Sequence, residues 1–209
     1  MGTPGYQNGF KLTLHPERLE QPLHRKKPTT YFVNSMSDLF HQSIPDEFID
    51  QVLGVIKKTP QHTYQILTKR AQRLQQYFKN RQCPSNVWLG VSVEDKKYGV
   101  PRIDLLRQVN VSIHFLSIEP LLEDIGLIDL TNIQWVIVGG ESGFKARAMK
   151  EEWIDNIQKQ CERAHVAFLF KQWGVWGVDG IKRHKKANGR LFNNRIWDEY
   201  PVNRQPVLF

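Results

Sequence analysis

The alternation of short apolar runs with amphipathic segments is the feature of this sequence that most limits its fold. Six runs of strand length span residues 30–34, 63–68, 86–93, 111–118, 133–140 and 166–173. Near-continuous apolar strands separated by helical patterns are typical of a parallel sheet whose two faces are both covered. Because the six units follow in series, and no glycine-rich dinucleotide fingerprint follows a strand, we predict an α/β fold. Specifically, we predict a TIM-like partial (β/α) barrel with about six parallel strands over residues 29–175.

The segments between and beyond the strands predict helices and a separate tail. Apolar residues recur at helical spacing in "IPDEFIDQVLGVIKK" and again over residues 153–164. Residues 1–28 predict an extended lead-in. Residues 176–209 predict a basic C-terminal appendage, in which Asn193–Asn194 suits the tight turn of a β-hairpin.

Length and composition restrict the class of protein further. The 209 residues suit one domain that buries a sizeable core without disulfides. The two cysteines stand far apart in no ligand spacing, which is typical of a reducing compartment. The chain opens without an apolar signal region, and no apolar run approaches about 18 residues. We therefore predict a cytoplasmic protein without a membrane span.

The net charge of +8 suggests a polyanionic partner. Basic clusters lie at residues 24–27, 69–73 and 182–186, which makes nucleic acid a candidate partner. The sequence has no helix-turn-helix, zinc-finger or RRM signature to support this interpretation. The alternative, a solvated basic surface, stays open.

Polar side chains follow every predicted strand. In parallel α/β barrels the carboxyl ends of the strands converge on one mouth, where ligand-binding groups gather. The candidate ligand-binding residues at this mouth are Asn34, Ser35, Asp38, Lys69, Ser92, Glu94, Glu119, Gly139, Gly140, Glu141, Ser142, Lys171 and Trp173. Carboxylates, hydroxyls and lysines in one ring suit a polar ligand. No paired His, Cys or Asp spacing indicates a metal site, and individual catalytic residues do not follow from the pattern.

The stretch "WVIVGGES" has two interpretations. Gly139 and Gly140 let the backbone approach a ligand closely, and Glu141 could accept hydrogen bonds from ribose hydroxyls or an amine. Alternatively, the glycines only let the chain leave a crowded barrel. A glycosidase is a further alternative, with two of Glu94, Glu119 and Glu141 as acid and base or nucleophile. In that case Trp173 and Trp176 would stack on sugar rings.

A series of motifs gives the chain a family resemblance. They are "LTLHPERLEQPL", "YFVNSMSDLFH", "QILTKR", "NVWLGVSVE", "FLSIEPLL", "WVIVGGESG", "FKQWG" and "GRLFNNRIWDEYP". Together they resemble an uncharacterised phage and bacterial protein family that is grouped with the radical S-adenosylmethionine (SAM) proteins. The resemblance covers about residues 2 to 201 and implies a TIM-like partial barrel with SAM as a cofactor.

The resemblance also implies a [4Fe–4S] cluster held by a three-cysteine segment, which this sequence lacks. Cys83 and Cys161 fall elsewhere and cannot replace three thiolates. Met1 looks like an internal residue of the family, so we expect the cysteine segment either to lie upstream of Met1 or to have been lost. By themselves, these residues are not expected to perform radical SAM chemistry.

Two classes of function remain from the sequence. The first is a SAM- or nucleotide-binding barrel, related to enzymes that modify nucleotides or nucleic acids. The alternative is a non-enzymatic module that binds nucleic acid or a partner protein. Without the first barrel strand, the edge at Tyr31–Asn34 should be exposed, which predicts either a homodimer through that edge or an N-terminal segment that covers it. The substrate and the reaction do not follow from the sequence.

Overall fold

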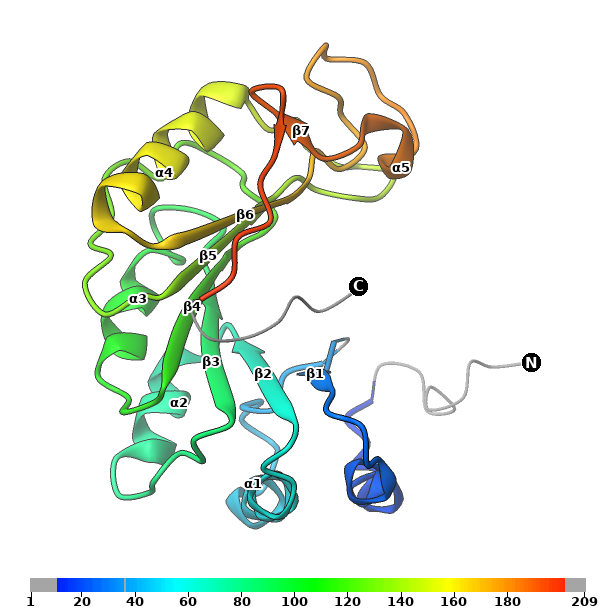
Figure 1. Ribbon diagram of the computed structural model, residues 1–209, viewed down its shortest axis with the longest axis vertical. Helices are drawn as coiled ribbons and strands as arrows, with labels where there is room; N and C mark the ends of the chain where they lie inside the picture. Colours follow the sequence, from blue (N-terminus) through cyan, green and yellow to red (C-terminus); the bar gives the residue numbers. More distant parts are fainter. Residues whose placement is uncertain (1–10, 36, 202–209) are drawn as a thin grey trace.

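The computed structural model describes residues 11–35 and 37–201, and it confirms the predicted α/β architecture. One parallel sheet has the strand order β1-β2-β3-β4-β5-β6. The strands are β1 (Thr30–Val33), β2 (Thr63–Thr68), β3 (Val87–Ser92), β4 (Ile113–Ile118), β5 (Trp135–Gly139) and β6 (Ala167–Gln172). The sheet curls while its helices lie on the outer side, so the fold is half of a barrel (Figure 1).

The helices follow the predicted pattern of alternation. They are α1 (Asp46–Lys58), α2 (Ala71–Phe78), α3 (Pro101–Arg107) and α4 (Glu151–Ala164). Two short 3-10 helices, Pro16–Arg18 and Gln21–His24, precede β1 within the predicted lead-in. Both α1 and α4 begin with two acidic residues, which stabilise the positive end of the helix dipole. No helix of the described part has the length and hydrophobicity needed to cross a membrane.

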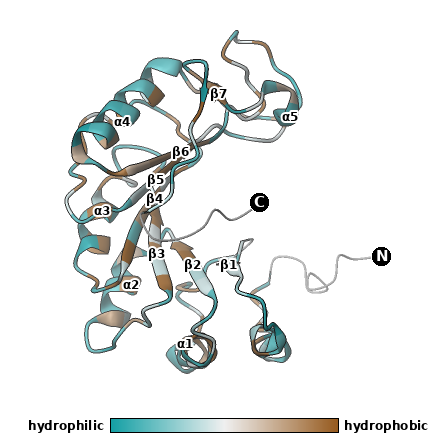
Figure 2. Cartoon of the chain, in the orientation of Figure 1, coloured by the Kyte–Doolittle hydropathy of each residue, from teal (hydrophilic) through white to brown (hydrophobic). Residues whose placement is uncertain are grey.

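The two faces of the sheet have different neighbours. The convex face packs against the helices and forms the main core, in which Leu89 and Ile154 are both fully buried. Figure 2 shows hydrophobic strands beneath helices whose outer surfaces are largely hydrophilic. The opposite face, called here the concave face, carries a second apolar cluster of Trp88, Phe115, Trp135 and Leu169. This cluster is the floor of the half-barrel.

The strand register arranges the concave face in rows. Gln65 on β2 lies between Phe32 on β1 and Trp88 on β3. Further toward the carboxyl ends, Ser92 on β3 pairs with Ser117 on β4. Here a row means the register partners across neighbouring strands. Side chains two residues apart on a strand share a face, so the next row on the concave face lies two residues further along each strand.

The C-terminal part forms the predicted hairpin and then returns to the sheet. The hairpin joins β7 (Leu191–Phe192) to β8 (Arg195–Ile196), and its turn residues Asn193 and Asn194 have φ values of 50° and 55°. A short helix, α5 (Lys185–Asn188), precedes it.

Residues 197–199 then pair antiparallel with the outer edge of β6. Phe170 N donates to Trp197 O at 2.9 Å, and Glu199 N donates to Phe168 O at 3.2 Å. These residues therefore cover the edge of β6.

The edge at β1 has no such cover within the described residues, because β1 pairs only with β2 there. An open edge offers unpaired backbone groups to another chain. We propose that two copies associate through β1, and we expect Phe32→Lys to reduce self-association because a lysine on an edge strand opposes pairing. Light scattering across a concentration series measures the effect.

The control for this experiment is Leu191→Lys, since Leu191 is also an exposed strand residue but lies in the hairpin. It should leave the mass unchanged. A wild-type protein that stays monomeric at every concentration would contradict association through β1.

Candidate functional site at the carboxyl ends of the strands

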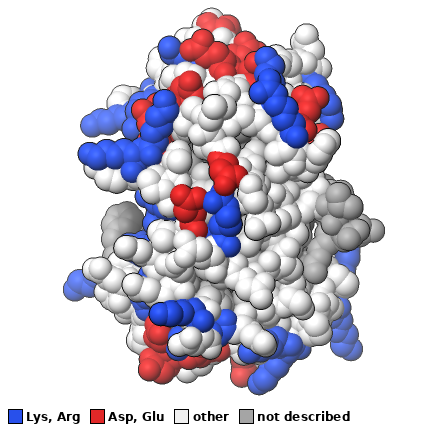
Figure 3. All heavy atoms as spheres, turned by 90° about the vertical axis from the view of Figure 1, so that its left-hand side faces the viewer, with Lys and Arg blue, Asp and Glu red and all other residues white. Residues whose placement is uncertain are grey.

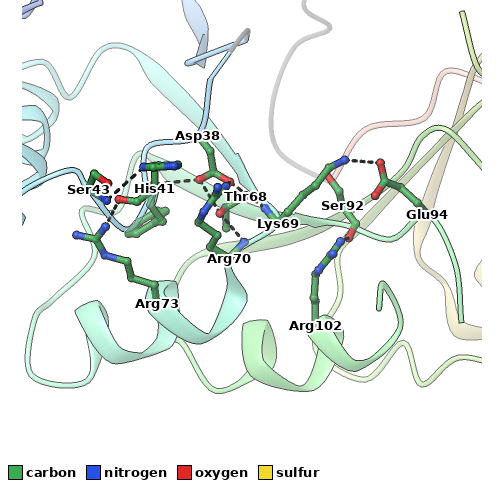
Figure 4. Close-up of polar contacts among 11 residues, drawn as sticks. Asp38, His41, Ser43, Thr68, Lys69, Arg70, Arg73, Ser92, Glu94 and Arg102 are labelled. Atoms are coloured by element: carbon green, nitrogen blue, oxygen red, sulfur yellow. Dashed lines mark hydrogen bonds and ion pairs between the residues drawn. The ribbon is translucent and has the colours of Figure 1, made fainter. Parts of the chain in front are cut away.

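Asp38 connects the loop after β1 to the end of β2. Its Oδ1 accepts hydrogen bonds from Thr68 Oγ1 at 2.7 Å and Phe40 N at 2.9 Å. Its Oδ2 accepts from Arg70 Nη1 at 2.9 Å and Lys69 N at 3.2 Å (Figure 4). Because four protein donors already occupy this carboxylate, Asp38 fixes the backbone from which the Lys69 side chain extends.

The Lys69 side chain extends from the end of β2 to the loop that follows β3. Its Nζ pairs with Oε1 of Glu94, which follows β3 (Figure 4). Below this pair, Arg102 Nη1 on α3 donates to the Ser92 carbonyl at 2.7 Å and holds the end of β3. The ends of β2 and β3 are thus joined by side chains as well as by the sheet.

Glu119, which follows β4, contacts side chains at the end of β6. Its Oε2 accepts from Lys171 Nζ at 3.0 Å, and its Oε1 accepts from Gln172 Nε2 at 3.0 Å. Gln172 Nε2 also lies 3.4 Å from Ser142 Oγ, in the loop after β5. Three strand ends therefore meet around one carboxylate.

Glu141 binds Arg147 in its own loop. Arg147 donates from its backbone N, Nε and Nη2 at 2.7, 2.9 and 2.8 Å. These hydrogen bonds lower the pKa of Glu141 to about 2. A glycosidase acid needs a raised pKa, so Glu141 does not suit that role. The charge of Glu94 also acts on Arg147, whose pKa is raised first by its hydrogen bonds to Glu141.

The two glycines before Glu141 have packing reasons for lacking a side chain. A Cβ on Gly140 would lie 1.9 Å from the carbonyl oxygen of Trp173, which is backbone and cannot rotate away. A Cβ on Gly139 would lie 3.0 Å from the Glu119 carboxyl carbon. Close packing alone therefore explains why residue 140 is a glycine, as expected if "GGES" only lets the chain leave a crowded barrel.

Together these groups form a charged rim, defined here as Asp38, Lys69, Arg70, Glu94, Glu119, Glu141, Arg147 and Lys171. The rim contains four carboxylates and four cations in ion pairs. The carboxylate side chains are 15–23% exposed, whereas the cationic side chains are 40–60% exposed. Ion pairs this exposed contribute only about 0–1 kcal/mol each. An incoming charged group can therefore exchange with them at little cost.

Polar groups without partners lie between the rim and the apolar floor. The Ser92 and Ser117 side chains lie on the concave face, and the two residues are only 4% and 6% exposed. Neither hydroxyl has a hydrogen-bond partner among residues 11–35 and 37–201. The concave face therefore changes from aromatic floor, through hydroxyls, to charged rim.

Most of the predicted ligand-binding residues meet at this end of the sheet. Lys69, Ser92, Glu94, Glu119, Gly139, Glu141, Ser142 and Lys171 lie together there, with Asp38 and Gly140 supporting them. Asn34 and Ser35 are exposed and make no side-chain hydrogen bond to another described residue. Trp173 is 3% exposed and packs against Phe170 and Phe192, with Nε1 donating to Leu191 O at 2.7 Å. It therefore lies beneath the hairpin and not at the rim.

The list of candidate ligand-binding residues left out three participants in this network: Arg70, Gln172 and Arg147. Arg70 follows Lys69 directly, and Gln172 follows Lys171, so both were within reach of the strand-end argument. Arg147 belongs to the basic stretch after "GGES", but its partner depends on how that loop folds back. No sequence pattern predicts such a return.

The cysteines do not fit an iron–sulfur cluster. Cys161 is buried on α4, and Cys83 packs against the convex core, away from the rim. Burial raises the pKa of both thiols to about 12, whereas cluster ligation needs thiolates. Within the described ranges, no group of three His, Cys, Asp or Glu side chains could hold a metal ion.

The basic clusters lie in different parts of the fold. Residues 24–27 lie near α1, whereas residues 182–186 include the start of α5 at the opposite end of the molecule (Figure 1). In the middle cluster, Lys69, Arg70 and Arg73 each pair with a carboxylate. On the helical face, lysine and arginine side chains alternate with acidic ones (Figure 3).

Two surface cavities lie away from the rim. One, of about 260 Å³, lies between α1 and α2, where Tyr77 Oη donates to Asp50 at 2.5 Å and Arg81 stacks on Tyr77 at 4.3 Å. The other, of about 660 Å³, lies between the start of α4 and Asn193. The polar groups of the first cavity pair with one another, so the rim remains the better candidate site.

Fold and site define an α/β half-barrel protein with a charge-balanced rim at the carboxyl ends of its strands. The chain belongs to the DUF5131 family, described as a protein of unknown function, whose model matches residues 2–201. This match carries no statement about radical SAM proteins. Neither the search of curated proteins nor that of solved structures found a match.

Proposed function

We propose that the concave face and its rim bind a nucleoside joined to an amino acid, with SAM as the representative ligand. The observation that carries this proposal is the change in chemistry along the concave face. The exposed Phe32 ring on the concave face of β1 suits a base, the Ser92 and Ser117 hydroxyls suit a ribose, and the rim suits charged groups.

The balance of charge favours an amino acid end over a phosphate chain. The rim holds as many carboxylates as cations, so it has no excess of positive charge for a polyanion. A zwitterion offers an ammonium to Glu119 and a carboxylate to Lys171. Because Lys171 is 48% exposed, it can turn from Glu119 to a ligand without leaving a buried charge unpaired.

The test is calorimetric titration of the full chain with SAM, and separately with adenosine, which lacks the amino acid. We expect Lys171→Met to weaken SAM binding about tenfold or more, since a charged hydrogen bond contributes about 1.5–3 kcal/mol. Adenosine binding should not change, because adenosine carries no carboxylate.

The matched control is Lys159→Met. Lys159 is 56% exposed and also pairs with a carboxylate, Asp155, but it lies on α4 outside the sheet. This variant should bind SAM like the wild type. Failure of the wild-type protein to bind SAM would reject the proposal.

A further inference from the structure

Gln65 is an unexplained polar residue in the apolar part of the concave face. It is 2% exposed, and among the described residues its Nε2 is the one side-chain nitrogen or oxygen that is both fully shut off from solvent and without a hydrogen-bond partner. Buried amide groups are nearly always paired, because leaving one unpaired destabilises the fold. An orphan donor at this place calls for an acceptor from outside the chain.

The neighbours of Gln65 suit a flat ring. The register places it between Phe32 and Trp88, so aromatic side chains stand on both sides of the amide. Phe32 is 41% exposed, which leaves the concave surface of β1 open to solvent. A planar heterocycle that approaches this surface can stack on the Phe32 ring while its edge meets the amide.

The distance to the rim suits an elongated ligand. Lys69 directly follows β2, four residues after Gln65, and four residues correspond to about 13 Å along an extended chain. On the neighbouring strand Val91 pairs with Thr68, so Ser92 and Lys69 each follow directly after this pair. A ligand that meets both Gln65 and the rim must therefore have its base and its charged end well separated.

We propose that Gln65 recognises the base of the ligand and that this base is adenine, an inference that rests on the proposed function. The Gln amide offers one donor and one acceptor side by side. Adenine presents the complementary pair, a ring nitrogen acceptor next to an exocyclic amine donor. We place the amide on the edge that carries N7, where a base with a carbonyl in place of that amine offers two acceptors, N7 and O6, and the amide can satisfy only one of them.

The test compares adenosine with inosine, which differ in that exocyclic group, by calorimetric titration of the full chain. Wild-type protein should bind adenosine about tenfold more tightly than inosine. Gln65→Leu should weaken adenosine binding about tenfold and remove the discrimination between the two nucleosides. Its melting temperature should stay the same or rise, because the substitution removes an unpaired buried donor.

A matched control is Gln160→Leu. Gln160 is also buried, at 8% exposed, but its amide is satisfied by the backbone of Gly126 and Ile128. This variant should lower the melting temperature and leave adenosine binding unchanged. The opposite behaviour of the two variants separates a ligand-binding glutamine from a structural one.

The outcomes also separate this inference from the proposed function. If Gln65→Leu binds adenosine and SAM as the wild type does, the role of Gln65 is rejected while SAM binding stands. If wild-type protein binds adenosine but not SAM, the role of the rim fails while that of Gln65 stands. Binding of neither ligand rejects both.

Discussion

Replacing Gly140 by alanine should lower the free energy of unfolding by about 3 kcal/mol or more. The added Cβ would lie 1.9 Å from the carbonyl oxygen of Trp173 and 2.6 Å from its carbonyl carbon. Gly140 N also donates to Gln172 O at 2.9 Å, so the two backbones cannot separate without losing this bond. Urea denaturation measures the effect as a lower transition midpoint.

Gly54→Ala is the control for this prediction. Gly54 lies inside α1, and a Cβ there would meet nothing within 4 Å. Alanine is the better helix former, so this variant should raise stability by about 0.5–1 kcal/mol. If Gly140→Ala unfolds at the wild-type midpoint, the chain after β5 does not pack against the end of β6 as closely as described.

Most of the fold follows from local patterns in the sequence. Each predicted strand contains an observed one, because apolar runs of this length need two covered faces wherever they lie. The ends differ by one or two residues: the run at 111–118 pairs only from Ile113, and that at 133–140 pairs only over Trp135–Gly139. The hairpin turn at Asn193 and Asn194 follows from the tolerance of asparagine for positive φ.

The site was predictable as a region but not in its contacts. Strand ends on one edge must lie together, so Glu94 and Glu119 could be placed in advance. The direction of Trp173 could not, because the register shifts between Val138 and Gly139 and pairs Gly139 with Gln172. A shift of one residue reverses which face the following side chains take.

Sequence patterns could not predict that residues 197–199 pair with β6, because most of the appendage separates the two segments in the chain. Its stability depends on one side chain of the floor. Trp135 is fully buried, and its Nε1 donates to Glu199 O at 2.9 Å. Its ring lies 5.1 Å from that of Tyr200.

We therefore expect Trp135→Ala to reduce the free energy of unfolding by about 3–5 kcal/mol. The substitution leaves a cavity between Trp88, Phe115 and Tyr200, and it removes the donor that holds Glu199. Denaturant titration gives the size of the loss. Hydrogen exchange at residues 197–200 should accelerate more than in α1, because those residues lose a direct contact.

Trp135→Phe separates the two contributions. Phenylalanine keeps an aromatic ring among Trp88, Phe115 and Tyr200 but cannot donate to Glu199. The free energy of unfolding should therefore fall by about 1 kcal/mol for the lost hydrogen bond, in addition to any loss of packing. Exchange at residues 197–200 should still accelerate, while most of the global stability remains. An alanine variant no less stable than the phenylalanine variant would mean that the floor does not hold the C-terminal segment. In that case the backbone pairing with β6 is sufficient to cover its edge.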